Sequence, residues 1–230
     1  MTKDQMLDIA SDATNLSELK SSEIPAIDLY VDQILNLVSG KLAEGSERYS
    51  GRQLTKTMIN NYSKDGVITP VKGKKYNREQ VAQILYVYSL KNTLSIGEIK
   101  RLLQGAYGID GFDASDLISL YDSYQEIRDL NGKRAINILE SDILEGLQLD
   151  PENEKDYVAT ICALVSLSAQ LKNMAQALID ERYPEVTNED EKKEKKEKAE
   201  QKAEQKAEQK AKAKAEKKKK KDAEGESATE

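Results

Sequence analysis

The sequence predicts a mainly α protein that ends in a charged, low-complexity tail. Apolar residues recur at three- and four-residue spacing along most of residues 1–185, which is typical of helices that bury one face. Patterns typical of helix caps precede several of these segments. The tail consists mostly of Lys, Glu, Gln and Ala, so the core has to form from the residues before it.

Four segments are expected in order. Residues 1–23 predict a flexible N-terminal arm or a short, loosely docked helix. Residues 24–105 hold the central helices, and residues 106–185 are a helical region that either completes the core or makes a dimer. Residues 186–230 predict disorder or nascent helix, because their AEQK repeats combine high helix propensity with like charges four residues apart.

The first strong helical pattern begins at Pro25, a residue that suits the first turn of a helix, and continues to Leu42. The positions expected to face inward are Ile27, Tyr30, Val31, Ile34, Leu37, Val38 and Leu42. Ser50 and Gln53 form a capping pattern for the next helix, which we expect to end near Lys64.

A turn is expected after that helix. Gly66 suits a C-cap with positive φ, and Pro70 prevents the helix from continuing. Residues 71–76, VKGKKY, then predict the tip of a small β-hairpin or a loop. The inward positions of the preceding helix are Leu54, Met58, Ile59 and Tyr62.

Three more caps follow. Asn77 with Gln80 and Ser95 with Glu98 form capping boxes, and Asp113 caps a further helix. The apolar positions behind these caps are Val81, Ile84, Leu85, Tyr88, Ile96, Ile99, Leu102, Leu103, Leu117, Leu120, Tyr121, Tyr124 and Ile127.

Two further helices are expected, separated from the Asp113 helix by a break at Asn131–Gly132. The first carries Ile136, Leu139, Ile143 and Leu147. The second begins at Asp150–Pro151 and runs to about Tyr183, with apolar positions in alternating steps of three and four, as in a coiled coil. A second apolar stripe runs beside the first, so a wide arc of this helix is expected to be covered. Cys162 lies on that stripe and is interpreted as a small core residue.

Charge is strongly segregated along the chain. Residues 52–101 hold ten Lys or Arg against three Asp or Glu, a net charge of +7. Residues 1–51 hold four against nine, and residues 102–188 hold six against sixteen. A basic region in an otherwise acidic chain favours an anionic partner.

Composition argues against several functions. The chain has no His, and its single Cys cannot form an internal disulfide, which favours a cytoplasmic protein. We find no nucleophile–base set and no phosphate-binding glycine pattern, and we expect no enzymatic activity, no cofactor and no metal. No run suits a signal peptide or a membrane span, so no membrane partner is expected.

The central stretch resembles the winged helix-turn-helix of MerR-class bacterial regulators. Tyr62–Pro70 matches the turn that follows the recognition helix of that class, and Lys74–Tyr76 matches the end of its basic wing. Ser95–Leu103 matches its Ser-Leu-x-Glu-Ile-Lys-x-Leu-Leu run. The sequence departs from the class at Asn60–Tyr62, where Arg-Tyr-Tyr is usual.

A longer stretch, from Ile24 to about residue 180, resembles a bacterial family called domain of unknown function 1836. The resemblance is carried by Ile24–Gln33 and Leu54–Tyr62. Together the two resemblances imply a sequence-specific DNA-binding transcriptional regulator with a mainly α, MerR-like winged helix-turn-helix fold. The residues expected to contact DNA are Arg52, Lys56, Thr57, Asn60, Asn61, Lys64, Lys72, Lys74, Lys75, Tyr76 and Arg78.

Two questions stay open at the level of sequence. The helix-turn-helix surface is alternatively a docking surface of a non-enzymatic adaptor, with the acidic C-terminal half carrying the partner site. A homodimer is a hypothesis that rests on the wide apolar arc of residues 152–183 and on the pairing of such modules with two DNA half-sites. Tyr62 and Tyr76 are interpreted first as packing residues.

Overall fold

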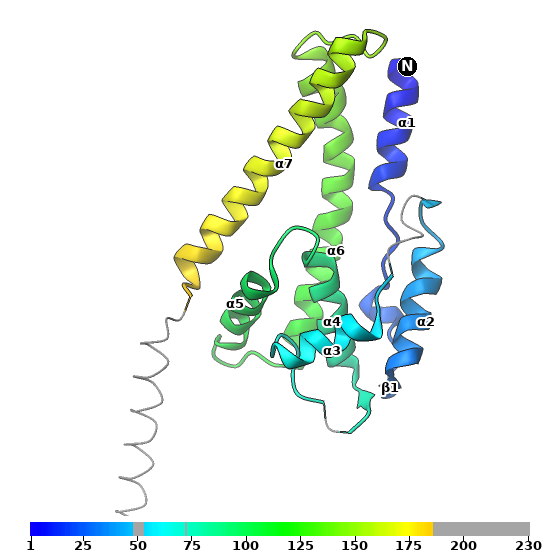
Figure 1. The fold of residues 1–230 in the computed structure, drawn as a ribbon. Helices are drawn as coiled ribbons and strands as arrows, with labels where there is room; N and C mark the ends of the chain where they lie inside the picture. Colours follow the sequence, from blue (N-terminus) through cyan, green and yellow to red (C-terminus); the bar gives the residue numbers. More distant parts are fainter. Residues whose placement is uncertain (48–52, 72, 186–230) are drawn as a thin grey trace, which may run out of the picture. The chain divides into compact units, whose positions relative to one another are not determined.

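The computed structural model describes residues 1–47, 53–71 and 73–185, and this part of the chain is mainly helical, as predicted. Strand within it is limited to β1 (Leu29–Tyr30) and β2 (Lys75–Tyr76). The chain divides after Pro184, and every element described below lies in Met1–Pro184 (Figure 1). The expected tail, residues 186–230, falls outside the described residues.

The helices are α1 (Lys3–Thr14), α2 (Val31–Leu42), α3 (Lys56–Lys64), α4 (Arg78–Leu90), α5 (Ile96–Tyr107), α6 (Ala114–Asn137) and α7 (Glu154–Arg182). A short 3-10 turn, η1 (Ser21–Glu23), precedes β1, and a π-helical segment, η3 (Ile138–Glu145), directly follows α6. The capping boxes predicted at Asn77–Gln80 and Ser95–Glu98 are confirmed. Asn77 Oδ1 accepts a hydrogen bond from the Gln80 N–H at 2.9 Å, and Ser95 Oγ accepts one from the Glu98 N–H at 3.2 Å. The predicted cap of α6, Asp113, is also confirmed.

α4 is the centre of the core, because every residue from Gln80 to Ser89 is buried. α5, α6 and β2 pack around it. The two glutamine amides of this buried helix need internal partners. Gln83 Oε1 accepts from the Thr69 N–H at 2.9 Å, and Gln80 Nε2 donates to the Pro70 carbonyl at 3.0 Å. These bonds fix the turn after α3 against α4.

The N-terminal half of α6 belongs to the same core. Leu117 and Tyr121 are buried, and the Tyr121 hydroxyl donates to the Leu19 carbonyl at 2.7 Å. Glu18 is held beside it, because its carboxylate accepts from Arg128 Nη1 at 2.6 Å and from Ser89 Oγ at 2.8 Å. The segment between α1 and η1 is therefore tied to α4 and α6.

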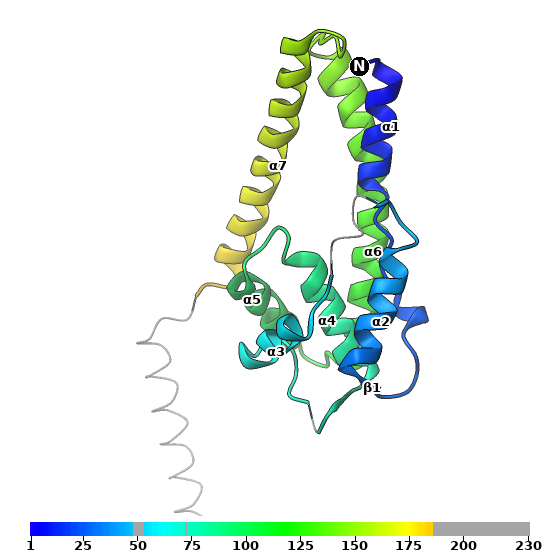
Figure 2. The same ribbon diagram turned by 45° about the vertical axis from the view of Figure 1, so that its right-hand side comes forward.

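α1 packs along the C-terminal half of α6 (Figures 1 and 2). Met6 forms a second, small core with Leu139 and Leu144. Of the two alternatives for residues 1–23, the structure therefore contains the docked helix.

The predicted start of the second helix was wrong. The helix expected from Pro25 begins at Val31, and Ile27, expected to face inward, is 68% exposed. The side chain of Gln33 accepts from the Tyr30 N–H at 2.9 Å and so caps the helix at Tyr30. The extended residues before it are then free to form β1.

The expected break in α6 was also wrong. α6 continues through Asn131–Gly132. A single Gly inside a helix costs only about 1 kcal/mol relative to Ala, which the packing of a long helix can offset. A Cβ added at Gly132 would make an ordinary contact with Thr14 of α1, at 3.6 Å.

Two other helix starts differ from prediction. α3 begins at Lys56, where the Thr55 hydroxyl accepts from the Met58 N–H at 3.2 Å, and the expected cap Ser50 lies outside the described residues. α7 begins at Glu154 rather than at Asp150–Pro151, with the Asn153 side chain as its cap.

α7 is attached to the rest of the unit mainly near its two ends. It contacts η3 near its start and α5 near its end. Arg101 Nη2 lies 2.7 Å from an Asp180 carboxylate oxygen, and Gln176 Nε2 donates to Glu98 at 2.6 Å. Cys162, interpreted as a core residue, is exposed because no element covers this part of the helix within the described residues.

α7 is also long and apolar enough, by length and composition alone, to cross a membrane. Its most apolar 18-residue window has a mean hydropathy of 1.3 and is 6% buried. We expected that no segment would approach a membrane span, and α7 corrects this expectation because it meets the length and composition of one.

Candidate nucleic-acid interface

α3 has one buried face and one exposed face. Ile59 and Tyr62 are buried and dock the helix on the core. Burial, with Tyr88 nearby, raises the pKa of the Tyr62 hydroxyl to about 12. Its position agrees with the interpretation of Tyr62 as a packing residue. Gly66 ends the helix with φ +65°, as predicted.

The exposed face of α3 carries five of the residues expected to contact DNA. All five side chains are accessible to solvent, and they present ammonium, hydroxyl and amide groups along the nine residues of the helix. They are Lys56, Thr57, Asn60, Asn61 and Lys64.

The segment after Pro70 turns at Gly73, which has φ +90°, and leads into β2. Of the two alternatives expected for residues 71–76, the local β-hairpin is wrong, because β2 pairs antiparallel with β1, with Leu29 opposite Tyr76 and Tyr30 opposite Lys75. Tyr76 is buried by this pairing. The Lys75 ammonium lies over the Tyr30 ring, 5.1 Å from its centroid.

A hollow of about 550 Å³ lies between α3, the turn before β2 and the start of α2. Lys56, Asn60 and Ser63 line it from α3, and Lys74 lines it from the turn. Because β1 runs directly into α2, the pairing of β1 with β2 holds the turn beside α3.

The predicted residues are only partly brought together. Lys56, Asn60, Lys74 and Tyr76 line the hollow, whereas Thr57, Asn61, Lys64 and Lys75 are exposed outside its lining. Arg78 is exposed, but its Nη2 donates to the Ser21 carbonyl at 3.0 Å. Arg52 and Lys72 lie outside the described residues.

Four residues near this surface were not predicted. Tyr30, Asp32 and Ser63 line the hollow, and the Lys100 ammonium comes within 3.7 Å of where a Cβ on Gly66 would lie. Tyr30 precedes α2, and Asp32 lies in its first turn. Both come near α3 through the β1–β2 pairing and the packing of α2 on α3, contacts between residues distant in sequence that give no local signal.

Some basic side chains of the described residues are held in ion pairs, and others, which include the lysines of this surface as well as Lys133 and Lys155, are not. Lys3, Lys41, Arg101 and Arg128 each form an ion pair with a carboxylate at 2.6–3.0 Å. In the described ranges, no carboxylate lies within ion-pair distance of the surface lysines Lys56, Lys64, Lys74 and Lys75. Their charge is therefore available to an anionic partner.

The described residues include no group of three or more His, Cys, Asp or Glu side chains placed to hold a metal ion. The chemistry of the hollow is thus that of ammonium, amide and hydroxyl groups around one carboxylate, Asp32.

Comparison with known proteins gives one match. Residues 19–124 match the family model described as Domain of unknown function (DUF1836). The matched range extends from the segment before η1 into α6, so it includes every described residue of the hollow. The searches of curated proteins and of solved structures gave no match.

Proposed function

We propose that the protein binds double-stranded DNA sequence-specifically and regulates transcription. The observation that carries the proposal is the exposed Lys and Asn face of α3 beside the lysines of the β2 turn, with no ion-pair partners among the described residues. In this proposal α2, α3 and the β2 turn are a MerR-like winged helix-turn-helix, and α3 is its recognition helix.

The dimensions and chemistry of α3 suit that role. The nine residues of α3 span about 13 Å of helix. A helix is about 10–12 Å across with its side chains, and the major groove, ~12 Å wide, admits one. Asn60 and Asn61 offer amides that bind adenine through two hydrogen bonds, and Lys56 offers a donor to guanine. The buried side chains of α3, which include Ile59, dock the helix on the core and so keep its opposite face oriented outward.

The turn and its neighbours supply contacts to the DNA backbone. Lys74 and Lys75 follow Gly73, and Lys64 and Lys100 lie near the C-terminal end of α3. If about six phosphates are neutralised, log affinity falls with log salt concentration with a slope of roughly −5.

The charge-reversal variant Lys56→Glu/Lys74→Glu tests the proposal in the full chain. Both side chains are exposed, so the fold is expected to be unchanged, and the tail of the protein is left intact. We expect DNA affinity to fall by at least ~100-fold at low salt, because each reversal replaces phosphate attraction with repulsion. Fluorescence anisotropy on the protein's own upstream DNA measures this loss.

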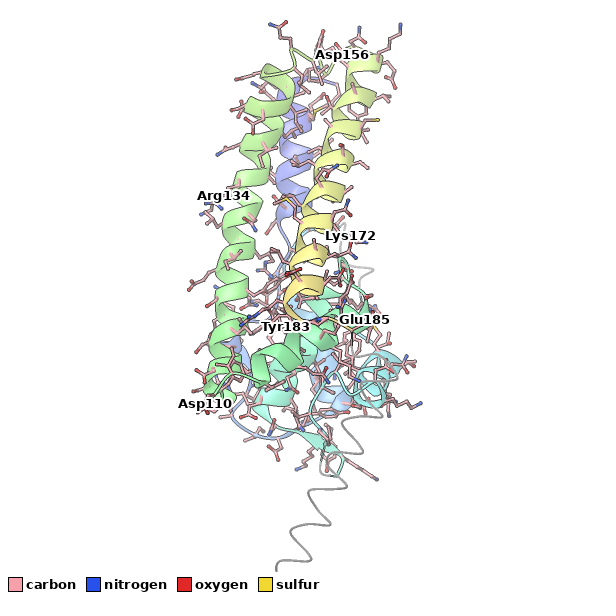
Figure 3. The ribbon with its side chains drawn as sticks, turned by 90° about the vertical axis from the view of Figure 1, so that its left-hand side faces the viewer. Asp110, Arg134, Asp156, Lys172, Tyr183 and Glu185 are labelled. Carbon is pink, nitrogen blue, oxygen red and sulfur yellow. The ribbon has the colours of Figure 1, made fainter. Side chains whose placement is uncertain are left out.

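The matched control is Lys133→Glu/Arg134→Glu, which reverses two exposed residues on α6 and changes the net charge by the same amount; Arg134 is labelled in Figure 3. It is expected to retain DNA binding. Equal binding by the double variant and the control would contradict the proposal. If the wild type shows no preference for its own DNA, and the wild type and the double variant capture the same protein partner, the adaptor alternative is favoured.

A further inference from the structure

α7 exposes an apolar face along most of its length. Seven large apolar side chains on this helix are between 38% and 70% exposed. They amount to roughly 700 Å² per chain, which approaches the ~800 Å² that one partner contributes to a standard protein interface. They are Val158, Ile161, Leu164, Val165, Leu171, Met174 and Leu178.

These residues follow a coiled-coil repeat. The positions in alternating steps of four and three form a line along the helix, which we name the seam: Tyr157, Ile161, Leu164, Ser168, Leu171, Ala175 and Leu178. Val158 and Val165 flank the seam on one side and Met174 on the other. Packing on the protein's own core instead uses Thr160 and Ile179, the two residues of α7 that are buried.

An apolar groove lies next to the N-terminal half of the seam. It has a volume of about 300 Å³ and is lined from α7 by Tyr157, Ile161 and Leu164. α1 and α6 form its other walls, through residues that include Ile9 and Ile136. A helix that lies along the seam therefore also covers this groove.

The chain's own tail does not suit this surface. Beyond Val186, the tail contains no apolar residue larger than Ala. A lipid bilayer also fits poorly, because the uncharged run from Tyr157 to Leu171 spans only about 22 Å before Lys172, whereas the hydrocarbon core is ~30 Å thick. The hydrogen bond of Gln176 and the ion pair of Asp180 also hold the C-terminal end of α7 on α5.

We propose that α7 pairs with α7 of a second copy of this chain, in antiparallel orientation. In the register that places Ile161 opposite Leu178, these two large residues pair near each end of the seam, and the large residues between them lie opposite small ones. Leu164 then lies opposite Ala175, and Leu171 opposite Ser168. Parallel pairing would instead place Ser168 against Ser168 and Ala175 against Ala175, leaving voids.

Charge at the helix ends agrees with the antiparallel register. Glu154 and Asp156 lie at the start of α7, and Arg182 lies at its end. The register places Asp156 of one copy beside Arg182 of the other, whereas parallel pairing places like charges together. Opposed helix dipoles favour the same orientation.

The first test is the mass of the full chain in solution, measured by size-exclusion chromatography with light scattering at tens of micromolar. We expect twice the chain mass of 25.7 kDa for the wild type. Leu171→Glu/Leu178→Glu is expected to give the single-chain mass, because it places four carboxylates in the paired seam. Circular dichroism checks that the helical content is unchanged.

Ser166→Glu/Asn173→Glu is the matched control. It adds the same charge to the same helix at exposed positions on the side opposite the seam, and it is expected to remain a dimer. A single-chain mass for the wild type, or equal masses for the two variants, overturns the proposal. Flotation of the wild type with anionic lipid vesicles, lost in the seam variant without a change of mass, overturns it in favour of a membrane surface.

Cross-linking tests the orientation in a Cys162→Ser background. A mixture of Leu164→Cys and Ala175→Cys chains should form a disulfide-linked dimer, while each variant alone should not. Cross-linking of each variant alone, without the mixed product, overturns the antiparallel register. No DNA is present in either assay, so their outcome is independent of the function proposed above.

Discussion

Gly66 and Gly40 show how one substitution has opposite effects at two glycines. Gly66 has φ +65°, a conformation that costs an L-residue about 1 kcal/mol, whereas Gly40 lies within α2 with open space around its Cα. We expect Gly66→Ala to lower the free energy of unfolding by about 1 kcal/mol and Gly40→Ala to raise it by about 0.5 kcal/mol. Urea denaturation measures both. A stabilising Gly66→Ala would contradict the described turn.

Glu98 links stability to pH at the residue scale. The hydrogen bond from the Ser95 N–H, at 2.6 Å, and a further bond from Gln176 lower the pKa of the Glu98 carboxyl below its ordinary value of 4.5. A carboxyl group whose pKa is lower in the folded state than in the unfolded state stabilises the protein at pH values above its unfolded-state pKa. This contribution is lost as the pH falls through the folded-state pKa.

We therefore expect the stability difference between the wild type and Glu98→Gln to shrink as pH falls below about 4.5. Urea midpoints of both proteins at several pH values measure it. A difference that stays constant through this range would show that the capping hydrogen bonds do not favour the ionised carboxylate.

Single residues also show what the sequence can predict. The caps at Asn77, Ser95 and Asp113 and the turn at Gly66 were predicted correctly, because each depends on bonds among residues close in sequence. The prediction that Cys162 is a core residue was wrong, because its exposure depends on which distant elements cover α7. An apolar stripe in the sequence does not show whether the surface that covers it belongs to the same chain.

At the scale of elements, α1 docks through a single buried side chain. Met6 is its one buried residue, and it packs on Leu139 and Leu144. The ion pairs of Lys3 with Glu140 and Glu145 are exposed and contribute little.

We expect Met6→Ala to lower the free energy of unfolding by about 2 kcal/mol, because it leaves a cavity between α1 and η3. Ile9→Ala, on the same helix but 45% exposed, is the control and should cost much less. Denaturant unfolding measures both. Equal, small effects would mean that α1 does not dock.

The bounds and buried faces of elements were predicted correctly where local sequence patterns determine them. They were predicted incorrectly where pairing between distant segments determines them. The end of α3 and the buried face of α2, including Ile34 and Val38, follow from spacing alone. β1 is only two residues long, and its partner β2 is far away in sequence, so the local pattern extended the helix back to Pro25. The same missed pairing hid Tyr30 and Asp32 from the predicted site.

At the scale of the whole molecule, charge and apolar surface are separated. The surface of α3 and the β2 turn presents lysines without ion-pair partners among the described residues, and α7 presents apolar residues without a cover from this part of the chain. The segregation of charge was visible in the sequence, because it requires only counting. Only the fold shows which of those charges lie on the same surface.

The most direct test of the account is DNA binding by the full chain at two salt concentrations. Fluorescence anisotropy compares the protein's own upstream DNA with a scrambled duplex of the same composition, for the wild type and for Lys56→Glu/Lys74→Glu. The account predicts a preference for the native DNA that persists near physiological salt and is lost in the variant. Weak, equal binding to both duplexes that vanishes with added salt would contradict sequence-specific recognition.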